Sequence, residues 1–108
     1  MALRRFAQVT RLKPEKREYY LKLHADTWPC VLDKIGDCNI KNYSIFLYED
    51  LLFAYFEYYG DNFELDMQKM AEDPCTKEWW EETAPCQESL SDNPGEWWLN
   101  IPEVFHTD

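Results

Sequence analysis

The chain has 108 residues, a length that predicts one domain spanning residues 1–108. Hydrophobic residues make up 45 % of it and aromatic residues 17 %, which is apolar enough to exclude a disordered acidic tail. Eleven Lys and Arg against 21 Asp and Glu give a net charge of −10 at pH 7. Such a surface repels phosphate backbones and anionic lipid, so we expect no nucleic-acid or membrane partner. A neutral ligand, such as a free sugar, suits this charge better than a phosphorylated one.

Four cysteines stand at Cys30, Cys38, Cys75 and Cys86, with no CxxC pair among them. The first ten residues have two arginines but lack the apolar run that is typical of a signal peptide. We therefore expect a cytoplasmic protein whose four thiols are reduced and mostly buried. The two histidines, His24 and His106, have no metal-ligand spacing, so we expect no metal site.

Four stretches predict strands, at residues 5–12, 40–48, 51–59 and 97 to about 106. In the second of them Tyr43 alternates with its polar neighbours and shares a face with two aliphatic residues. Glu49 and Asp50 predict a tight turn between the second and third strands.

Two helical regions separate these strands. The first opens at Pro14, and Pro29 should break it near residues 26–28 before it resumes toward Ile35. The second runs from residue 63 to about 83, with a break at Pro74. We expect Asp73 to cap the short helix that begins there.

The order βαββαβ predicts a ferredoxin-like α+β sandwich, in which both helical regions cover one face of a four-stranded antiparallel sheet. The other sheet face then needs a cover. Because the strands carry many aromatic residues, we expect a second copy of the chain to supply it and form a homodimer.

His24 is the candidate acid–base residue, because the imidazole pKa of about 6.5 allows proton transfer in both directions near neutrality. It shares a helix stripe with Tyr20 and with Thr27 or Trp28, just before the break at Pro29. We expect carbonyl groups freed at that break to fix the tautomer of its ring. From its position alone, His24 is equally well explained as a structural histidine whose hydrogen bonds are satisfied at the end of the helix. His106 is expected at the surface.

Aromatic residues are the candidate sugar platform. Trp79 and Trp80 are adjacent on a predicted helix, so one can enter the core while the other faces a cleft. Indole rings stack on the C–H faces of a pyranose, and the Tyr43 hydroxyl can both donate to and accept from a polyol. Core packing is the more common use of such residues.

A set of short motifs runs in a fixed order along nearly the whole chain. It comprises Tyr20-x-x-x-His24, Trp28-Pro29, Asn42-Tyr43-Ser44-Ile45, Leu51-Leu52-Phe53-Ala54, Trp79-Trp80 and Glu103-Val104-Phe105. This set resembles the L-rhamnose mutarotase family.

The resemblance implies a ferredoxin-like chain that pairs into a dimeric α/β barrel and uses no metal or organic cofactor. It implies that His24 is the proton donor and that the sugar contacts are Tyr20, Tyr43, Trp79 and Trp80. The implied activity is the interconversion of the α and β anomers of L-rhamnose by acid–base ring opening and closure.

Three departures from the family pattern leave the expected reaction unchanged but leave open which sugar is the substrate. Thr10 stands where many bacterial members have methionine, and residues 85–90 and 95–98 differ from the enteric type. An L-fucose-preferring mutarotase is therefore an alternative. A non-catalytic sugar-binding module and a small monooxygenase or haem-handling protein are two others, since related folds host several activities.

Overall fold

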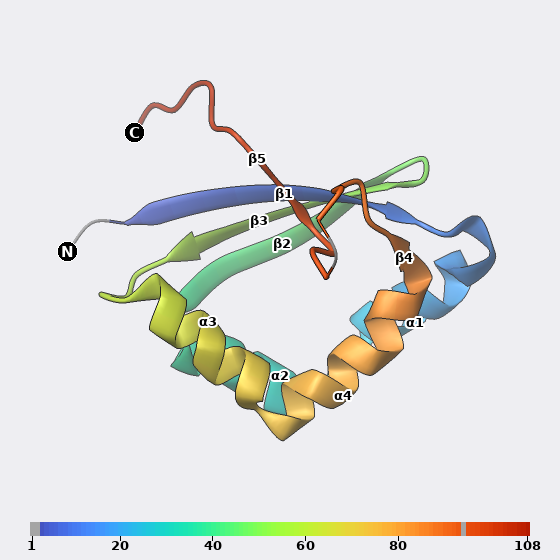
Figure 1. Ribbon diagram of the computed structural model, residues 1–108, viewed down its shortest axis with the longest axis horizontal. Helices are drawn as coiled ribbons and strands as arrows, with labels where there is room; N and C mark the ends of the chain where they lie inside the picture. The colour runs from blue at the N-terminus through green and yellow to red at the C-terminus, as the bar shows by residue number, and fades with distance from the viewer. Residues whose placement is uncertain (1–2, 94) are drawn as a thin grey trace.

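The computed structural model describes residues 3–93 and 95–108. The elements in chain order are β1 (Arg4–Leu12), η1 (Pro14–Lys16), α1 (Arg17–Ala25), α2 (Pro29–Asp37), β2 (Ile40–Tyr48), β3 (Leu51–Tyr58), α3 (Phe63–Glu72), α4 (Pro74–Thr83), η2 (Ala84–Cys86), β4 (Gln87–Glu88) and β5 (Leu99–Ile101). All four α-helices lie on the same side of the sheet (Figure 1).

The sheet is antiparallel, with β2, β3 and β1 side by side. The fourth position, along the free edge of β1, is divided between two short strands: β4 pairs with Arg11 and Leu12, and β5 pairs with residues 7–9. The predicted ferredoxin-like arrangement is confirmed. The predicted last strand is too long, because Pro102 has no N–H to continue the ladder and the residues after it leave the sheet.

Prolines begin the helices as predicted, because the missing N–H costs nothing in the first turn. Pro14, Pro29 and Pro74 each stand at the start of a helical segment. The Asp73 side chain accepts a hydrogen bond from the backbone N–H of Thr76 at 2.9 Å, which confirms the predicted cap. The two breaks turn each predicted helical region into a pair of short helices.

A β-bulge in β2 controls which way Tyr43 points. Residues 42 and 43 together oppose the single residue Phe56 of β3, and Asn42 has a φ of +53°, which asparagine tolerates. As a result Ile40 and Tyr43, three residues apart, both face the helices. The Tyr43 ring lies 5.5 Å from that of Phe56.

The core under the helices has two parts. One cluster, at the α2 and α3 end, contains Cys38, Ile40, Phe56, Tyr58 and Met70. The other, at the α1 end, contains Leu12, Tyr20, Leu52 and Cys86. Ala54, between them in the middle of β3, is buried but belongs to neither cluster. The helix-covered sheet face is therefore divided at its centre.

The cluster at the α2 and α3 end also contains a set of polar side chains that hydrogen-bond one another. The Tyr58 hydroxyl donates to Asp66 Oδ2 at 2.5 Å and accepts from the backbone N–H of Asn62 at 3.0 Å. The Asn39 amide donates to the same carboxylate oxygen at 3.0 Å. These hydrogen bonds hold the pKa of Asp66 below its usual range. We call Asp66, Tyr58 and Asn39 the Asp66 cluster.

The expectation of four reduced thiols is wrong. Cys30 and Cys75, in the first turns of α2 and α4, form a disulfide with their Cα atoms 6.2 Å apart. The two helix starts meet in space, which the 45-residue separation in sequence does not reveal. Cys38 and Cys86 are free and buried, as expected.

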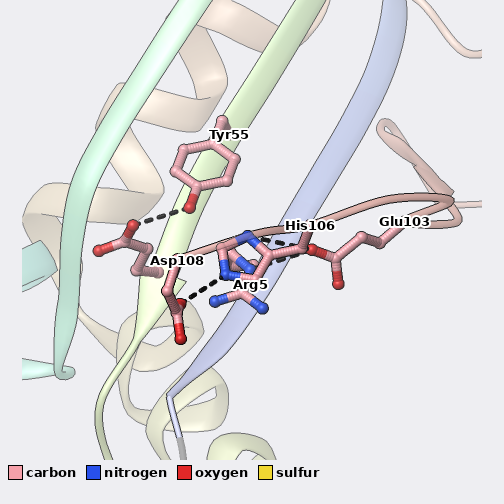
Figure 2. A network of polar contacts seen from close by, with 6 residues as sticks. Arg5, Tyr55, Glu103, His106 and Asp108 are labelled. Carbon is pink, nitrogen blue, oxygen red and sulfur yellow. Dashed lines mark hydrogen bonds and ion pairs between the residues drawn. The ribbon is translucent and has the colours of Figure 1, made fainter.

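The helix-free face of the sheet is largely uncovered. Large apolar side chains exposed on it or on the C-terminal segment are Phe46, Tyr48, Ile101, Val104 and Phe105. The C-terminal segment crosses this face, where Arg5 pairs with Glu103 at 3.0 Å and His106 pairs with Asp108 at 2.9 Å (Figure 2). None of the helices within residues 3–93 and 95–108 has the length and apolar character that a bilayer crossing requires.

Candidate active site

His24 occupies the last turn of α1, and its ring is fixed through one nitrogen. Nδ1 lies 2.9 Å from the carbonyl oxygen of Tyr20, one turn earlier in the same helix. Because a carbonyl oxygen can only accept, Nδ1 carries the proton, and Nε2 of the neutral ring has the free lone pair. The tautomer is therefore fixed within the helix, and the expectation that carbonyls freed at the break would fix it is wrong.

Burial makes the neutral form of His24 the favoured one. Desolvation lowers the pKa of His24 below its usual 6.5, and the hydrogen bond to the Tyr20 carbonyl opposes this only in part. At neutral pH the Nε2 lone pair is available to accept a proton. The imidazolium formed in this way can then return the proton to a bound ligand.

Aromatic rings hold the imidazole on two sides. The Tyr20 ring stacks on it with centroids 4.2 Å apart, and the Trp79 ring meets it edge-on at 5.1 Å. Trp28 in turn packs edge-on against Trp79 at 5.1 Å. These contacts join the α1 end, the α1–α2 break and α4 around one histidine, and they restrict its rotation.

The two tyrosines of the site remain protonated phenols. Burial raises the pKa of Tyr43 to about 12, although 38 % of the residue as a whole is exposed. Burial also raises the pKa of Tyr20, and the nearby Tyr43 phenol adds to the effect. Neither can act as a phenolate base near neutrality. Both can donate a hydrogen bond to an oxygen of a ligand.

Polar atoms of the site are open rather than sealed. Among the described residues, no protein group hydrogen-bonds His24 Nε2 or the hydroxyls of Tyr20 and Tyr43. Among the described residues that are not exposed, no fully buried side-chain nitrogen or oxygen lacks a hydrogen-bond partner. His24 Nε2 and the Tyr20 hydroxyl are therefore accessible to solvent, and a ligand with hydroxyl groups can satisfy them. We call His24, Tyr20, Tyr43 and Trp79 the His24 site.

Trp79 and Trp80 divide as the helix geometry predicts, one inward and one outward. Trp79 is 6 % exposed and contacts His24, whereas Trp80 is 43 % exposed. Trp80 lines an open surface hollow of about 530 Å³ together with Trp97 and Pro85. The structure thus brings Tyr20, His24 and Trp79 into contact and places the Tyr43 phenol near that of Tyr20. It leaves Trp80 on an adjoining surface.

Trp28 is a site residue that the predicted set omitted. Its contact with Trp79 closes the aromatic wall beside His24. The signal in the sequence is its spacing of four residues from His24, which is itself four residues after Tyr20. Trp98, which packs against the cluster that contains Tyr20, left no comparable signal.

Two other features lie apart from this site. A hollow of about 510 Å³ on the helix-free sheet face is lined by Arg5, Tyr55, Glu103 and His106, the residues of Figure 2, and by neighbours of theirs. Within residues 3–93 and 95–108, no group of three His, Cys, Asp or Glu side chains is arranged to hold a metal ion.

Comparisons with known proteins agree on one family. The family model described as L-rhamnose mutarotase matches residues 5–107. The L-rhamnose mutarotase of Listeria monocytogenes is 35 % identical over 106 residues, which cover 96 % of this chain and 98 % of that protein. The one from Phocaeicola vulgatus is 33 % identical over 99 residues, covering 90 % and 91 %.

Solved structures extend the likeness to the fold. An L-rhamnose mutarotase from Formosa agariphila superposes with a TM-score of 0.77 at 26 % identity, covering 97 % of this chain and 99 % of that one. Tetracenomycin F2 cyclase from Streptomyces glaucescens, at a TM-score of 0.66 and 15 % identity, shares the fold alone. The family model and the relatives together show that the chain belongs to the L-rhamnose mutarotase family.

Proposed function

We propose that this chain interconverts the α and β anomers of L-rhamnose, with His24 as the acid–base residue. The observation that carries the proposal is the state of the His24 ring. Nδ1 is held by the Tyr20 carbonyl, while Nε2 has no partner among the described residues and is open to solvent. Family membership supplies the sugar.

Ring opening requires one proton to leave the anomeric hydroxyl and one to reach the ring oxygen. Both oxygens are bonded to the same carbon, so a single nitrogen can serve them in turn. Nε2 accepts the anomeric proton and returns it to the ring oxygen as the bond between C1 and that oxygen breaks. Rotation about C1–C2 and the reverse transfers close the ring on the other face, with no net change in protons.

The remaining site residues position the sugar. The neutral phenols of Tyr20 and Tyr43 donate hydrogen bonds to sugar oxygens, and Trp79 offers indole surface beside the imidazole. Trp80 remains a predicted sugar contact, because the family resemblance implies it. In this structure its side chain lines the adjoining hollow. Apolar pockets reject an added hydroxyl only modestly, so related sugars should also react.

NMR exchange spectroscopy of the anomeric protons tests this proposal. The wild-type protein should accelerate α–β exchange of L-rhamnose, and L-fucose and D-glucose in parallel samples define the preference. His24→Gln should lower the acceleration by about 10²- to 10⁴-fold, the usual share of general acid–base catalysis. His106→Gln is the matched control, because His106 lies on the other sheet face.

Two results would overturn the proposal in different ways. Saturable sugar binding without accelerated exchange would make the chain a non-catalytic sugar-binding module. Full activity in folded His24→Gln would remove His24 from the mechanism, and faster exchange of L-fucose than of L-rhamnose would change the substrate.

We propose further that the functional unit is a homodimer in the cytoplasm. The exposed apolar residues of the helix-free face support the dimer, since Phe46 is 62 % and Phe105 is 78 % exposed. A second copy on this face would cover them, as the family resemblance implies. A mass of one chain by sedimentation at micromolar concentration would contradict the dimer.

Alkylation of free thiols in intact cells would show whether the Cys30–Cys75 disulfide persists in the cytoplasm.

A further inference from the structure

We infer that the paired side-chain amides of Gln8 and Asn100 form a second, uncharged wall of the sugar site and recognise sugar hydroxyl groups. The inference deepens the proposed function, because it assigns a specificity role to two residues outside the family motifs quoted above. It rests on where the pair lies and on the hydrogen-bonding groups that the pair leaves free.

Strand alternation places Gln8 on the helix-covered face of β1. Its neighbours two and four residues away on the same face pack into the core: Phe6 against the cluster at the α2 and α3 end, and Leu12 in the cluster at the α1 end. Gln8 stands between them and is half-buried. It therefore projects into the middle of the face, where the core is divided.

The strand neighbours of Gln8 on the helix-covered face are one small residue and one amide. Its cross-strand partner on β3 is Ala54, which offers only a methyl group. Its partner on β5 is Asn100, and the Gln8 amide donates to Asn100 Oδ1 at 2.9 Å, so both side chains lie on the same face. Tyr43 and Tyr20 pack against the rows on either side of this one, next to Phe56 and Leu52.

The pair has hydrogen-bonding groups to spare. Gln8 Oε1 has no partner among the described residues and is not a sealed buried atom, and Asn100 is exposed. An acceptor and an NH₂ donor thus lie side by side, held in place by the bond between the two amides. Two neighbouring sugar hydroxyls, one donating and one accepting, match this arrangement. Neutral amides can bind them without the desolvation cost of a charged group.

Side-chain amide NMR signals provide a test that does not depend on catalysis. In ¹⁵N-labelled wild-type protein titrated with L-rhamnose, the NH₂ signals of Gln8 and Asn100 should shift in a saturable way. Gln68 is an internal control, because it makes a similar exposed bond to Glu72 on α3. Its signals should stay in place.

Matched leucine variants give the kinetic test. Gln8→Leu should raise KM for L-rhamnose about three- to tenfold, the effect of losing one neutral hydrogen bond. The value of kcat and its pH dependence should stay close to wild type, since His24 is untouched. Gln68→Leu, which loses a comparable bond elsewhere, should change neither constant.

The outcomes separate this inference from the proposed function. Accelerated exchange with no shift at Gln8 or Asn100, and with equal KM for Gln8→Leu and Gln68→Leu, would overturn the inference alone. Saturable shifts without accelerated exchange would support the amide wall and overturn the mutarotase proposal. Loss of kcat with unchanged KM in folded Gln8→Leu would also contradict a hydroxyl-binding role.

Discussion

Tyr58 and Tyr20 are both almost fully buried under the helices, yet their hydroxyl groups have opposite environments. The Tyr58 hydroxyl has two protein partners and belongs to the Asp66 cluster. The Tyr20 hydroxyl has no partner among the described residues, and the same is true of His24 Nε2 beside it. The contrast separates two uses of buried polar groups. A completed set of hydrogen bonds stabilises the fold, and an incomplete set that stays accessible can bind a ligand.

The disulfide links the two regions, and its removal has the largest expected effect. It closes a loop of 45 residues, which in the chain-entropy model contributes about 4 kcal/mol to the free energy of unfolding. Urea unfolding with and without reductant measures this, and the Cys30→Ser, Cys75→Ser double variant should be unaffected by reductant. An unchanged wild-type midpoint under reductant would show that the disulfide does not stabilise the chain.

Hydrogen exchange of the reduced protein would sharpen the comparison. Because Cys75 lies in the first turn of the helix that carries Trp79, amides of α4 around the His24 site should lose protection. Amides around the Asp66 cluster should lose less, since its hydrogen bonds do not depend on α4.

One substitution made at both tyrosines tests the comparison directly. Tyr58→Phe leaves the Asn62 N–H and the Asp66 carboxylate short of a partner, so it should lower the free energy of unfolding. Tyr20→Phe removes a hydroxyl without a protein partner, so the free energy of unfolding should change little. Anomeric exchange should instead slow about three- to tenfold, the effect of one lost hydrogen bond.

Urea unfolding and exchange spectroscopy on the two variants give four values. The opposite pattern, with a destabilised Tyr20→Phe variant of full activity, would mean that the Tyr20 hydroxyl serves the fold.

The pH dependence is the smallest expected effect. Because burial lowers the pKa of His24 below 6.5, the neutral base should predominate at pH 7 and the exchange rate should fall as pH drops through the lowered value. The rate should stay flat up to pH 9, since the pKa values of both phenols lie well above that. A rate that rises on acidification would contradict a base of this kind.

The free energy of unfolding should also depend on pH through the protonation of His24, and the direction of this dependence follows from the lowered pKa. The unfolded chain binds a proton at His24 more readily than the folded chain does, because the folded pKa is the lower one. The contribution of His24 to stability should therefore fall as pH drops from 6.5 toward the lowered pKa. His24→Gln should remove this part of the pH dependence, which urea midpoints measured at several pH values would show.

The sequence was most informative where single residues have strong local rules. Proline positions predicted both helix breaks, the Asp73 cap was predicted from its place before Pro74, and three of the strands agree with the structure to within one residue. His24 and Tyr20 were paired by helical spacing alone, and their stacked rings confirm the pairing.

Features that depend on distant segments could not be predicted in this way. The Cys30–Cys75 disulfide exists because two helix starts meet in space, and no local pattern records that meeting. The division of the fourth sheet position between β4 and β5 depends on which part of β1 each short segment reaches. Gln8 hydrogen-bonds Asn100, which is 92 residues away in the sequence, so no local pattern pairs these two residues.

The divided sheet edge also bears on how such a protein can diversify. The chain leaves the sheet after Glu88 and re-enters it at Leu99, and each short strand has its own pairing with β1. Residues inserted or deleted between them would leave both sets of backbone hydrogen bonds intact. The two segments that depart from the enteric family pattern, residues 85–90 and 95–98, lie at the two ends of this excursion, and the second ends two residues before Asn100 of the proposed sugar wall. Lineages could exchange this loop, and alter sugar preference, while keeping the scaffold and the histidine unchanged.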